Sequence, residues 1–378
     1  MNSRERILCA LRGGEVDHVP FVLEWNVTQR LHEKLFWRDE RERLALHRKM
    51  GWDAEVRVAT IVSPSGEVTV RRSADTENKK DRIISQTWAT PAVTLNERLR
   101  LTGDWDDSEL TGPYIGLASD FRTTRYVSVP FKNESDLAAL PYIFPVKSDA
   151  DASSIKENYC EQRALADEFG YPLFAHCDAG MDWLFWLYPL QEAIFRAIDE
   201  PDLIRTILDR INEAKRDRLE LLLSLGVDGV VRRGWYEGAD IWSPELLARF
   251  AWPAIKTEIG MAHGAGVPYI YTIDTGVKAI AAELAAMPID CILGIDPGAG
   301  EMTAREIFDA FPDKTLWGGL SGPRDFGAET PDNAACAVTE AINVYGRRRL
   351  ILGMSASYRH YYPWENFEAA ERTWKELR

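Results

Sequence analysis

Charged and aromatic side chains follow a short apolar run near the middle of the sequence. The run 229–231 (Gly-Val-Val) is typical of a buried strand. The residues after it include Arg232, Arg233, Trp235, Tyr236 and Glu237. Guanidinium groups bind carboxylates, and a glutamate can transfer protons. A Ser-Pro-Glu sequence at 243–245 then predicts a capped helix start. Strand, polar tip and capped helix form the repeating unit of an α/β barrel, whose chemistry lies at the strand tips.

Other predicted strands end in polar groups too. Their tips carry Glu24, Trp25, His176, Asp178, Tyr271, Asp274, Asp296, Trp317 and Ser321, and the last strand is followed by Ser355, Ser357, Tyr358, Arg359 and His360. If all the strands are parallel, their carboxyl ends meet at one pocket. Carboxylates, imidazoles and arginines gathered there could bind an acidic substrate, hold a metal ion or move protons.

Roles can be predicted for members of this set. The predicted catalytic residues are His176, Glu237, Asp274 and His360, because imidazoles and carboxylates are common acid–base groups. The predicted substrate contacts are Glu24, Trp25, Arg233, Tyr236, Tyr271 and Tyr358. A divalent metal could be held by Glu24, His176, Glu237 and Asp274. The alternative for each histidine is a structural role, and Asp296 could simply cap its Asp-Pro-Gly turn.

The two adjacent arginines should face opposite sides of their strand. Successive side chains of a strand alternate, so Arg232 and Arg233 cannot both point inward. Gly229 shares the parity of Arg233 and would leave room in a crowded interior, which favours Arg233 as the inward residue. We expect Arg233 to be buried beside Glu237 and to pair with it, with Tyr236 and Glu237 turned over the mouth.

Strand and helix patterns alternate regularly along most of the chain. Predicted strands lie at 21–23, 173–178, 229–231, 267–274, 291–296, 315–320 and 350–354. Roughly eight such units predict a closed (β/α)8 barrel of the TIM type, with residues 1–378 as one domain. Alternating apolar residues at about 55–130 predict an antiparallel β insertion that covers the mouth. The alternative is two domains that meet near 141–148.

Composition narrows the classes of function. A net charge of −14 and the lack of a basic block argue against a nucleic-acid partner. Five scattered cysteines without CxxC spacing fit a reducing compartment. The amino-terminus resembles no signal peptide, and the sequence has no apolar run of about 20 residues, so we expect a cytoplasmic protein without a membrane span. We also expect a small-molecule substrate, and the chain could form a homodimer.

Several segments carry a resemblance to a known superfamily. They are SRERILCALRGGEVDHVPF, SPELLARFAWPAIK, LGIDPGAG, TLWGGLSG and YYPWENFEAAERTW. Together they resemble the uroporphyrinogen decarboxylase superfamily, which also contains the methyl-cobamide methyltransferases. The resemblance spans nearly the whole chain and is loosest at about 55–130. It implies a (β/α)8 barrel with its site at the strand carboxyl ends.

Departures from the superfamily motifs narrow the expected chemistry. Where the decarboxylase has an Arg-Gln-Ala-Gly-Arg stretch that grips porphyrinogen carboxylates, this chain has 24–28 (Glu-Trp-Asn-Val-Thr). Where the methyltransferases hold zinc with His-x-Cys and a later Cys, it has 272–274 (Thr-Ile-Asp) and 354–355 (Met-Ser). Threonine and methionine do not replace zinc thiolates.

The resemblance, with these departures, implies methyl transfer or demethylation of a small polar or methoxylated substrate. A corrinoid or folate carried by a partner, such as a corrinoid protein, would be the implied cofactor. The alternatives are a decarboxylase of a small acid, or of a porphyrinogen, and a non-catalytic ligand-binding barrel.

Overall fold

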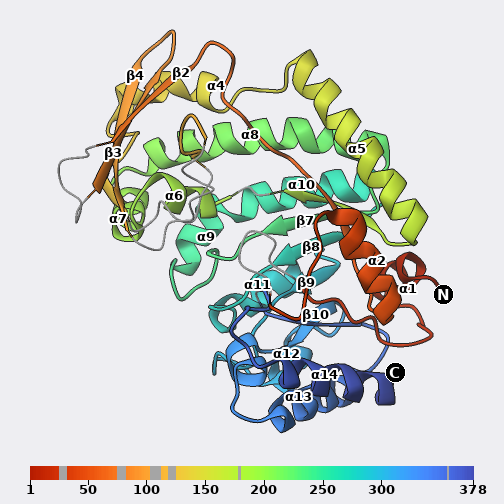
Figure 1. The fold of residues 1–378 in the computed structure, drawn as a ribbon. Coiled ribbons are helices and arrows are strands. Elements are labelled where there is room, and N and C mark those ends of the chain that lie inside the picture. Colours follow the sequence, from red (N-terminus) through yellow and green to blue (C-terminus); the bar gives the residue numbers. More distant parts are fainter. Residues whose placement is uncertain (25–31, 75–81, 103–111, 118–124, 178–179, 356) are drawn as a thin grey trace.

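A curled parallel sheet forms the centre of the molecule (Figure 1). The computed structural model describes residues 1–24, 32–74, 82–102, 112–117, 125–177, 180–355 and 357–378. Seven strands pair in the order β1-β6-β7-β8-β9-β10-β11, and every pairing is parallel. Their bounds are β1 Val56–Ala59, β6 Leu173–Cys177, β7 Gly229–Arg233, β8 Tyr269–Thr272, β9 Cys291–Leu293, β10 Thr315–Leu320 and β11 Leu350–Met354. Parallel strands with helical crossovers confirm the α/β class.

Helices join successive strands and cover the outside of the sheet (Figure 1). They are α1 Ser3–Leu11, α2 Glu40–Met50, α4 Leu140–Ile143, α5 Asp149–Phe169, α6 Asp182–Leu187, α7 Leu190–Asp199, α8 Pro201–Leu225, α9 Pro244–Phe250, α10 Trp252–Gly264, α11 Ala281–Ala286, α12 Ala304–Ala310, α13 Pro331–Tyr345 and α14 Trp364–Leu377. Two helices predicted as continuous are each divided, at Pro189 and before Pro253. A proline lacks the N–H that an α-helix needs, so both breaks have a local cause.

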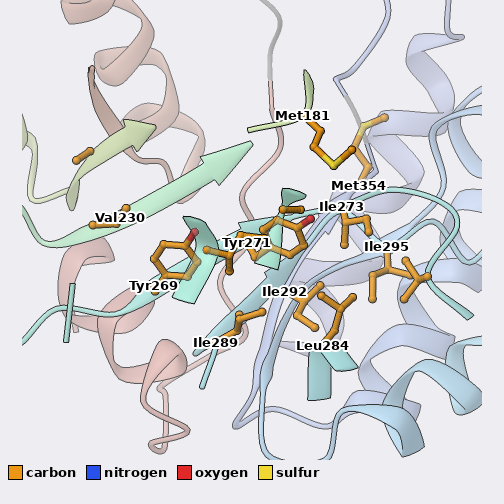
Figure 2. Close-up of a cluster of buried hydrophobic side chains, with 14 of the residues drawn as sticks. Met181, Val230, Tyr269, Tyr271, Ile273, Leu284, Ile289, Ile292, Ile295 and Met354 are labelled. Atoms are coloured by element: carbon orange, nitrogen blue, oxygen red, sulfur yellow. The ribbon is translucent and has the colours of Figure 1, made fainter. Parts of the chain in front are cut away.

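The inner face of the sheet is lined by one apolar cluster. Its members from the strands and the first extended segment are Val22, Phe174, Val231, Ile270, Cys291, Trp317 and Ile351, and α1 adds Ile7, Ala10 and Leu11. Val230 belongs instead to the outer core beneath the helices. Figure 2 shows members of this outer core, including Tyr269 and Ile292. Alternation along β7 therefore places Arg233 on the inner face, together with Val231. It places Arg232 on the outer face.

An extended segment at residues 20–22 lies beside β11. Val22 N–H donates to Leu352 O at 2.9 Å, and Leu352 N–H donates to Pro20 O at 2.8 Å. On its other side, Asp53 N–H donates to Phe21 O at 3.1 Å. The described residues thus form a curled seven-stranded sheet with this segment alongside. They do not establish the predicted closed ladder of eight strands.

A separate antiparallel sheet follows β1. Its strands pair in the order β2-β3-β4-β5, with bounds β2 Thr69–Ala74, β3 Arg82–Ala89, β4 Thr94–Leu101 and β5 Tyr126–Ser128. The hydroxyl of Tyr126 donates to Trp186 O at 2.7 Å, which ties this sheet to α6. The predicted antiparallel character is confirmed for the strands β2 to β5, but it is wrong for 56–59, which pair in parallel with β6. That strand alternates valines with charged residues, a pattern shared with half-exposed antiparallel strands.

Among the described residues, no helix is both long and apolar enough to cross a membrane.

Candidate active site

Ionic side chains gather on the inner face of the sheet: Arg233 ends β7 and Asp274 follows β8, whereas Glu55 and Arg57 lie at the start of β1. Arg57 Nη1 donates to Glu24 Oε1 at 3.0 Å, and Arg57 Nε donates to Glu55 Oε1 at 2.8 Å. Arg57 lies opposite Phe174 in the parallel register, which places it on the inner face with the apolar cluster. We call Glu24, Glu55, Arg57, His176, Arg233 and Asp274 the carboxyl-end cluster. The contacts among Glu24, Glu55 and Arg57 connect β1 to the segment that follows residues 20–22.

His176 extends this chain of contacts from β6. Its Nε2 lies 3.2 Å from Glu55 Oε2, and only 4% of the residue is exposed. The other ring nitrogen, Nδ1, is buried and has no hydrogen-bond partner among the residues that the structure describes. His176 is therefore held at one nitrogen and keeps unused hydrogen-bonding capacity at the other.

Arg233 brings a second cation to the cluster. Its Nη2 lies 3.9 Å from Glu24 Oε1, and its guanidinium carbon lies 5.0 Å from the centre of the Trp235 ring. Its side chain is 31% exposed. Partial burial raises the pKa of Glu24, but Arg57 and Arg233 outweigh that effect and the net pKa is lowered. Glu24 is thus ionised at neutral pH and repels a second negative charge nearby.

Asp274 is the carboxyl group that experiences this repulsion. Burial, and then the negative charges of Glu24 and Asp296, raise its pKa to about 7, while Arg359 acts in the opposite direction. Its Oδ1 is buried without a hydrogen-bond partner among the described residues. Asp296 accepts a hydrogen bond from Ser355 Oγ at 2.7 Å. Asp274 can therefore be a neutral acid near pH 7, the condition that efficient general-acid catalysis requires.

A cavity of about 300 Å³ adjoins the cluster. Apolar walls come from Val22, Leu293 and Trp317, and polar walls from Glu24, Glu55 and Arg57. Ligand sites commonly combine apolar walls with a few polar groups, and this volume suits a small molecule. Because the cavity also extends to Arg43 and Gln162, it passes between residues 22–24 and β1.

Two predicted site residues, Glu237 and Tyr271, lie on the outer face of the sheet rather than on the inner face. Glu237 is fully buried and pairs with Arg232, not Arg233, at 2.8 Å. Arg232 also pairs with Glu258 at 2.8 Å, and Tyr271 donates to Glu237 Oε2 at 2.9 Å. The expected Arg233–Glu237 pair is wrong, because Gly234 lets the chain turn Glu237 back toward the outer core. A Cβ on that glycine would lie 2.6 Å from Glu237 Oε2.

Three further predicted residues direct their side chains to other partners, although the Tyr358 N–H donates to Glu24 O at 2.9 Å. Tyr236 packs edge-on against Phe185 at 5.5 Å. Tyr358 is buried among aromatic rings and its hydroxyl donates to Pro363 O at 3.1 Å. His360 is exposed and lines a separate hollow with His32. That Tyr358 and His360 close the pocket stays a prediction. Trp25 and Asp178 lie outside the described residues.

The predicted metal set is not brought together. Glu237 is separated by β7 from Glu24, His176 and Asp274, and the described residues contain no group of three or more ligands suited to a metal ion. Thiolate ligation has no support either, because burial raises the pKa of Cys177 to about 12 and also raises that of Cys291. The described residues thus do not fit a zinc site of the methyltransferase type.

Glu55 and Arg57 were not among the predicted site residues. Their signal in the sequence is a charged residue at every second position, interleaved with Val56 and Val58. Such alternation indicates a strand with one apolar face, but it does not show whether the charged face meets solvent or a site.

Comparison with known proteins supports the fold. No family model matches the chain, and no curated protein matches it. Among solved structures, a methyltransferase from Methanosarcina mazei is similar at a TM-score of 0.59 and 15% identity, covering 100% of this chain and 99% of that one. A B12-independent methionine synthase from Shewanella sp. W3-18-1 overlaps 57% of this chain and 64% of its own, at 12% identity and a TM-score of 0.37. The first likeness concerns the fold alone.

Proposed function

We propose that this chain is an enzyme that removes a methyl group from a small polar or methoxylated substrate bound beside the carboxyl-end cluster. The observation that carries the proposal is the buried Asp274 carboxyl: its Oδ1 has no hydrogen-bond partner among the described residues, and burial and the charges of Glu24 and Asp296 raise its pKa to about 7. A fold like that of a methyltransferase supports the same reaction class. The described polar groups suit proton transfer and orientation, so the methyl acceptor must come from outside the cluster.

The proposed step balances with one acid and one external acceptor. The bond between the substrate oxygen and its methyl carbon breaks, and the electron pair stays on the oxygen. Asp274 donates its proton to that oxygen, giving an alcohol and an ionised Asp274. A thiolate, a reduced cobamide on a partner protein or a reduced folate would take the methyl group; for the folate, the N–H proton that the new N–CH3 bond displaces would pass to the ionised Asp274 or to water. Protonating the leaving oxygen lowers the barrier, and general-acid catalysis typically contributes roughly 10²–10⁴-fold in rate.

The other cluster members have supporting roles in this proposal. Arg57 keeps Glu24 ionised, and the charge of Glu24 helps to keep Asp274 protonated. Arg233, with its partly exposed guanidinium, would orient a polar group of the substrate. Apolar contact would come from Trp317 and Leu293.

We further propose that residues 20–22 serve as an eighth strand of a barrel and that the chain is one domain. The hydrogen bonds from this segment to Leu352 and Asp53 support closure. The antiparallel sheet would then shield the substrate from water. Limited proteolysis that releases a stable fragment at 141–148 would contradict a single domain.

A decarboxylase is the second candidate, because Arg233 could bind a substrate carboxylate. The bond from the carboxylate to the substrate carbon would break, carbon dioxide would leave, and the electron pair would stay on the carbon. Asp274 would then protonate that carbon. This reaction uses the same acid but needs no methyl acceptor.

The test compares reactions and two matched variants. Methoxybenzoates and methanol are offered with a thiol, reduced cobalamin or tetrahydrofolate, and the methylated acceptor is measured. We expect turnover by the wild type and a loss of roughly 10²–10⁴-fold in Asp274→Asn. Asp332→Asn, the same change on the exposed start of α13, should retain full activity.

Three results would overturn this reaction. Release of carbon dioxide from small acids without methyl transfer would favour the decarboxylase. Ligand-dependent stabilisation without turnover would favour a binding barrel. Equal turnover by wild type and Asp274→Asn would remove the proposed acid.

A further inference from the structure

His176, Glu55, Arg57 and Glu24 form an unbroken series of side-chain contacts. Imidazole Nε2 contacts Glu55 Oε2 at 3.2 Å, and the other oxygen of Glu55 accepts from Arg57 at 2.8 Å. Arg57 also donates to Glu24 at 3.0 Å. Both oxygens of Glu55 are therefore occupied, one by the guanidinium and one by the imidazole.

The protonation of Glu55 decides which atom carries the hydrogen in the contact with His176. Burial raises the pKa of Glu55, but Arg57 and His176 outweigh burial and bring it down to about 2. An ionised carboxylate has no proton to donate and acts only as an acceptor. The hydrogen between the two groups must therefore be on Nε2 of His176.

When His176 is neutral, the opposite ring nitrogen then has a defined state. A neutral imidazole carries one N–H, so an Nε2–H tautomer leaves Nδ1 as a bare acceptor. Nδ1 is buried and has no partner within the described part of the chain. His176 shares the inner face with Phe174 and Val231, so this acceptor lies inside the curled sheet rather than under the helices.

We infer that Glu55 is a positioning residue that fixes His176 as its Nε2–H tautomer, so that Nδ1 accepts a hydrogen bond from a hydroxyl or amine of the bound ligand. Arg57 and Glu24 assist by holding the Glu55 carboxylate in place. A buried acceptor without a partner is costly, and a donor on the ligand would remove that cost. The inference rests on the proposed function only in placing a ligand beside the cluster. The tautomer itself does not depend on methyl transfer.

The tautomer can be read directly by nitrogen-15 NMR of histidine-labelled protein without any substrate. At pH 8 the two ring nitrogens of His176 are expected to show the pattern of an Nε2–H imidazole. The chain has 6 histidines, and loss of one signal set in His176→Gln assigns the residue. His47 provides an internal reference, because its ring contacts the Asp53 carbonyl rather than Glu55.

Substitution of Glu55 tests the positioning role. Glu55→Gln replaces an acceptor with an amide that can also donate, so the Nε2–H population should fall by several-fold while the His47 signals stay in place. Glu340→Gln, the same change on the exposed face of α13, should leave His176 unaltered.

Three outcomes would overturn the inference: an Nδ1–H tautomer in the wild type, a doubly protonated His176 ring at pH 8, or an unchanged tautomer in Glu55→Gln. The wild-type spectrum remains decisive if the variant fails to fold. Failure of the methyl-transfer assay would leave the tautomer result standing.

Discussion

The two faces of β7 place adjacent arginines in opposite environments. On the outer face, Arg232 is fully buried and is bonded to Glu237 and Glu258, each at 2.8 Å. On the inner face, Arg233 is 31% exposed and lies 3.9 Å from Glu24. The outer carboxylates also accept hydrogen bonds from the hydroxyls of Tyr269 and Tyr271. The outer network is tightly bonded, while the inner cluster is open to a cavity.

This difference separates groups that hold the fold from groups that are available to a ligand. The inner face retains Asp274 Oδ1 and His176 Nδ1, which have no hydrogen-bond partner among the described residues. In contrast, both carboxylates beside Arg232 are bonded to charged and hydroxyl donors. Residue type alone does not distinguish a group that stabilises the fold from one that is available to a ligand, whereas the face of the strand on which the group lies does distinguish them.

The largest effect should come from removing the outer arginine. Arg232→Met leaves two buried carboxylates without their shared cation, and breaking a buried pair costs about 3–5 kcal/mol. Arg233→Met should cost less than about 1 kcal/mol, because pairs of partly exposed groups contribute little. Chemical denaturation of both variants measures the contrast. Equal losses of stability would contradict the assignment of the two faces.

A smaller and pH-dependent effect is expected at Glu55. Its pKa is about 2 in the folded protein and ordinarily about 4.5, so its ionised form stabilises the folded state above pH 4.5. That contribution is lost as the pH falls toward 2. Glu55→Gln should therefore lose at most about 3 kcal/mol at pH 7 and less at pH 3. A loss that is equal at both pH values, measured by denaturation, would argue against an ionised Glu55.

Asp274 should show the opposite sign. Its folded pKa of about 7 lies above the ordinary 3.8, so ionisation opposes folding and the wild type loses stability as the pH rises from 4 to 7. Asp274→Asn removes this cost and should be more stable at pH 8 by on the order of 2 kcal/mol, allowing for partial exposure. At pH 4 the two proteins should unfold alike. A variant that is less stable than the wild type at pH 8 would contradict the raised pKa.

The smallest effect is expected at His360. Because this residue is exposed in a hollow apart from the cluster, His360→Ala should change stability by less than about 0.5 kcal/mol. Turnover on any substrate should also stay within about twofold, as for a surface change. Steady-state kinetics of His360→Ala and His176→Ala would show the contrast. A large loss of turnover in His360→Ala would mean that His360 belongs to the site.

Local pattern predicted much of the fold. The predicted strands at 315–320 and 350–354 are confirmed with those bounds, because continuous apolar runs bounded by turns indicate buried parallel strands. Strand β1 was misassigned because an inner face that carries Glu55 and Arg57 resembles a solvent-exposed one. Alternation predicted that Arg232 and Arg233 face opposite sides, and Gly229, at the parity of Arg233, favoured Arg233 as the inward residue.

The site depends on contacts that the sequence does not reveal. His176 and Glu55 are 121 residues apart, and no local spacing connects them. Glu237 lies beyond the end of β7, where the alternation of a strand no longer applies, and the turn at Gly234 reverses its direction. Tyr358 and His360 similarly follow a strand whose exit direction is set by packing against aromatic residues of the last helix.

A titration of the Asp274 carboxyl would test the central claim most directly. Carbon-13 NMR of aspartate-labelled protein follows each carboxyl, and the signal absent from Asp274→Asn identifies the residue. The environment of Glu24 and Asp296 predicts a midpoint near pH 7. Glu24→Gln should lower that midpoint, because it removes a negative charge that raises the pKa of Asp274. A midpoint below about 5 in the wild type, close to that of an ordinary aspartate, would contradict a neutral acid at the carboxyl-end cluster.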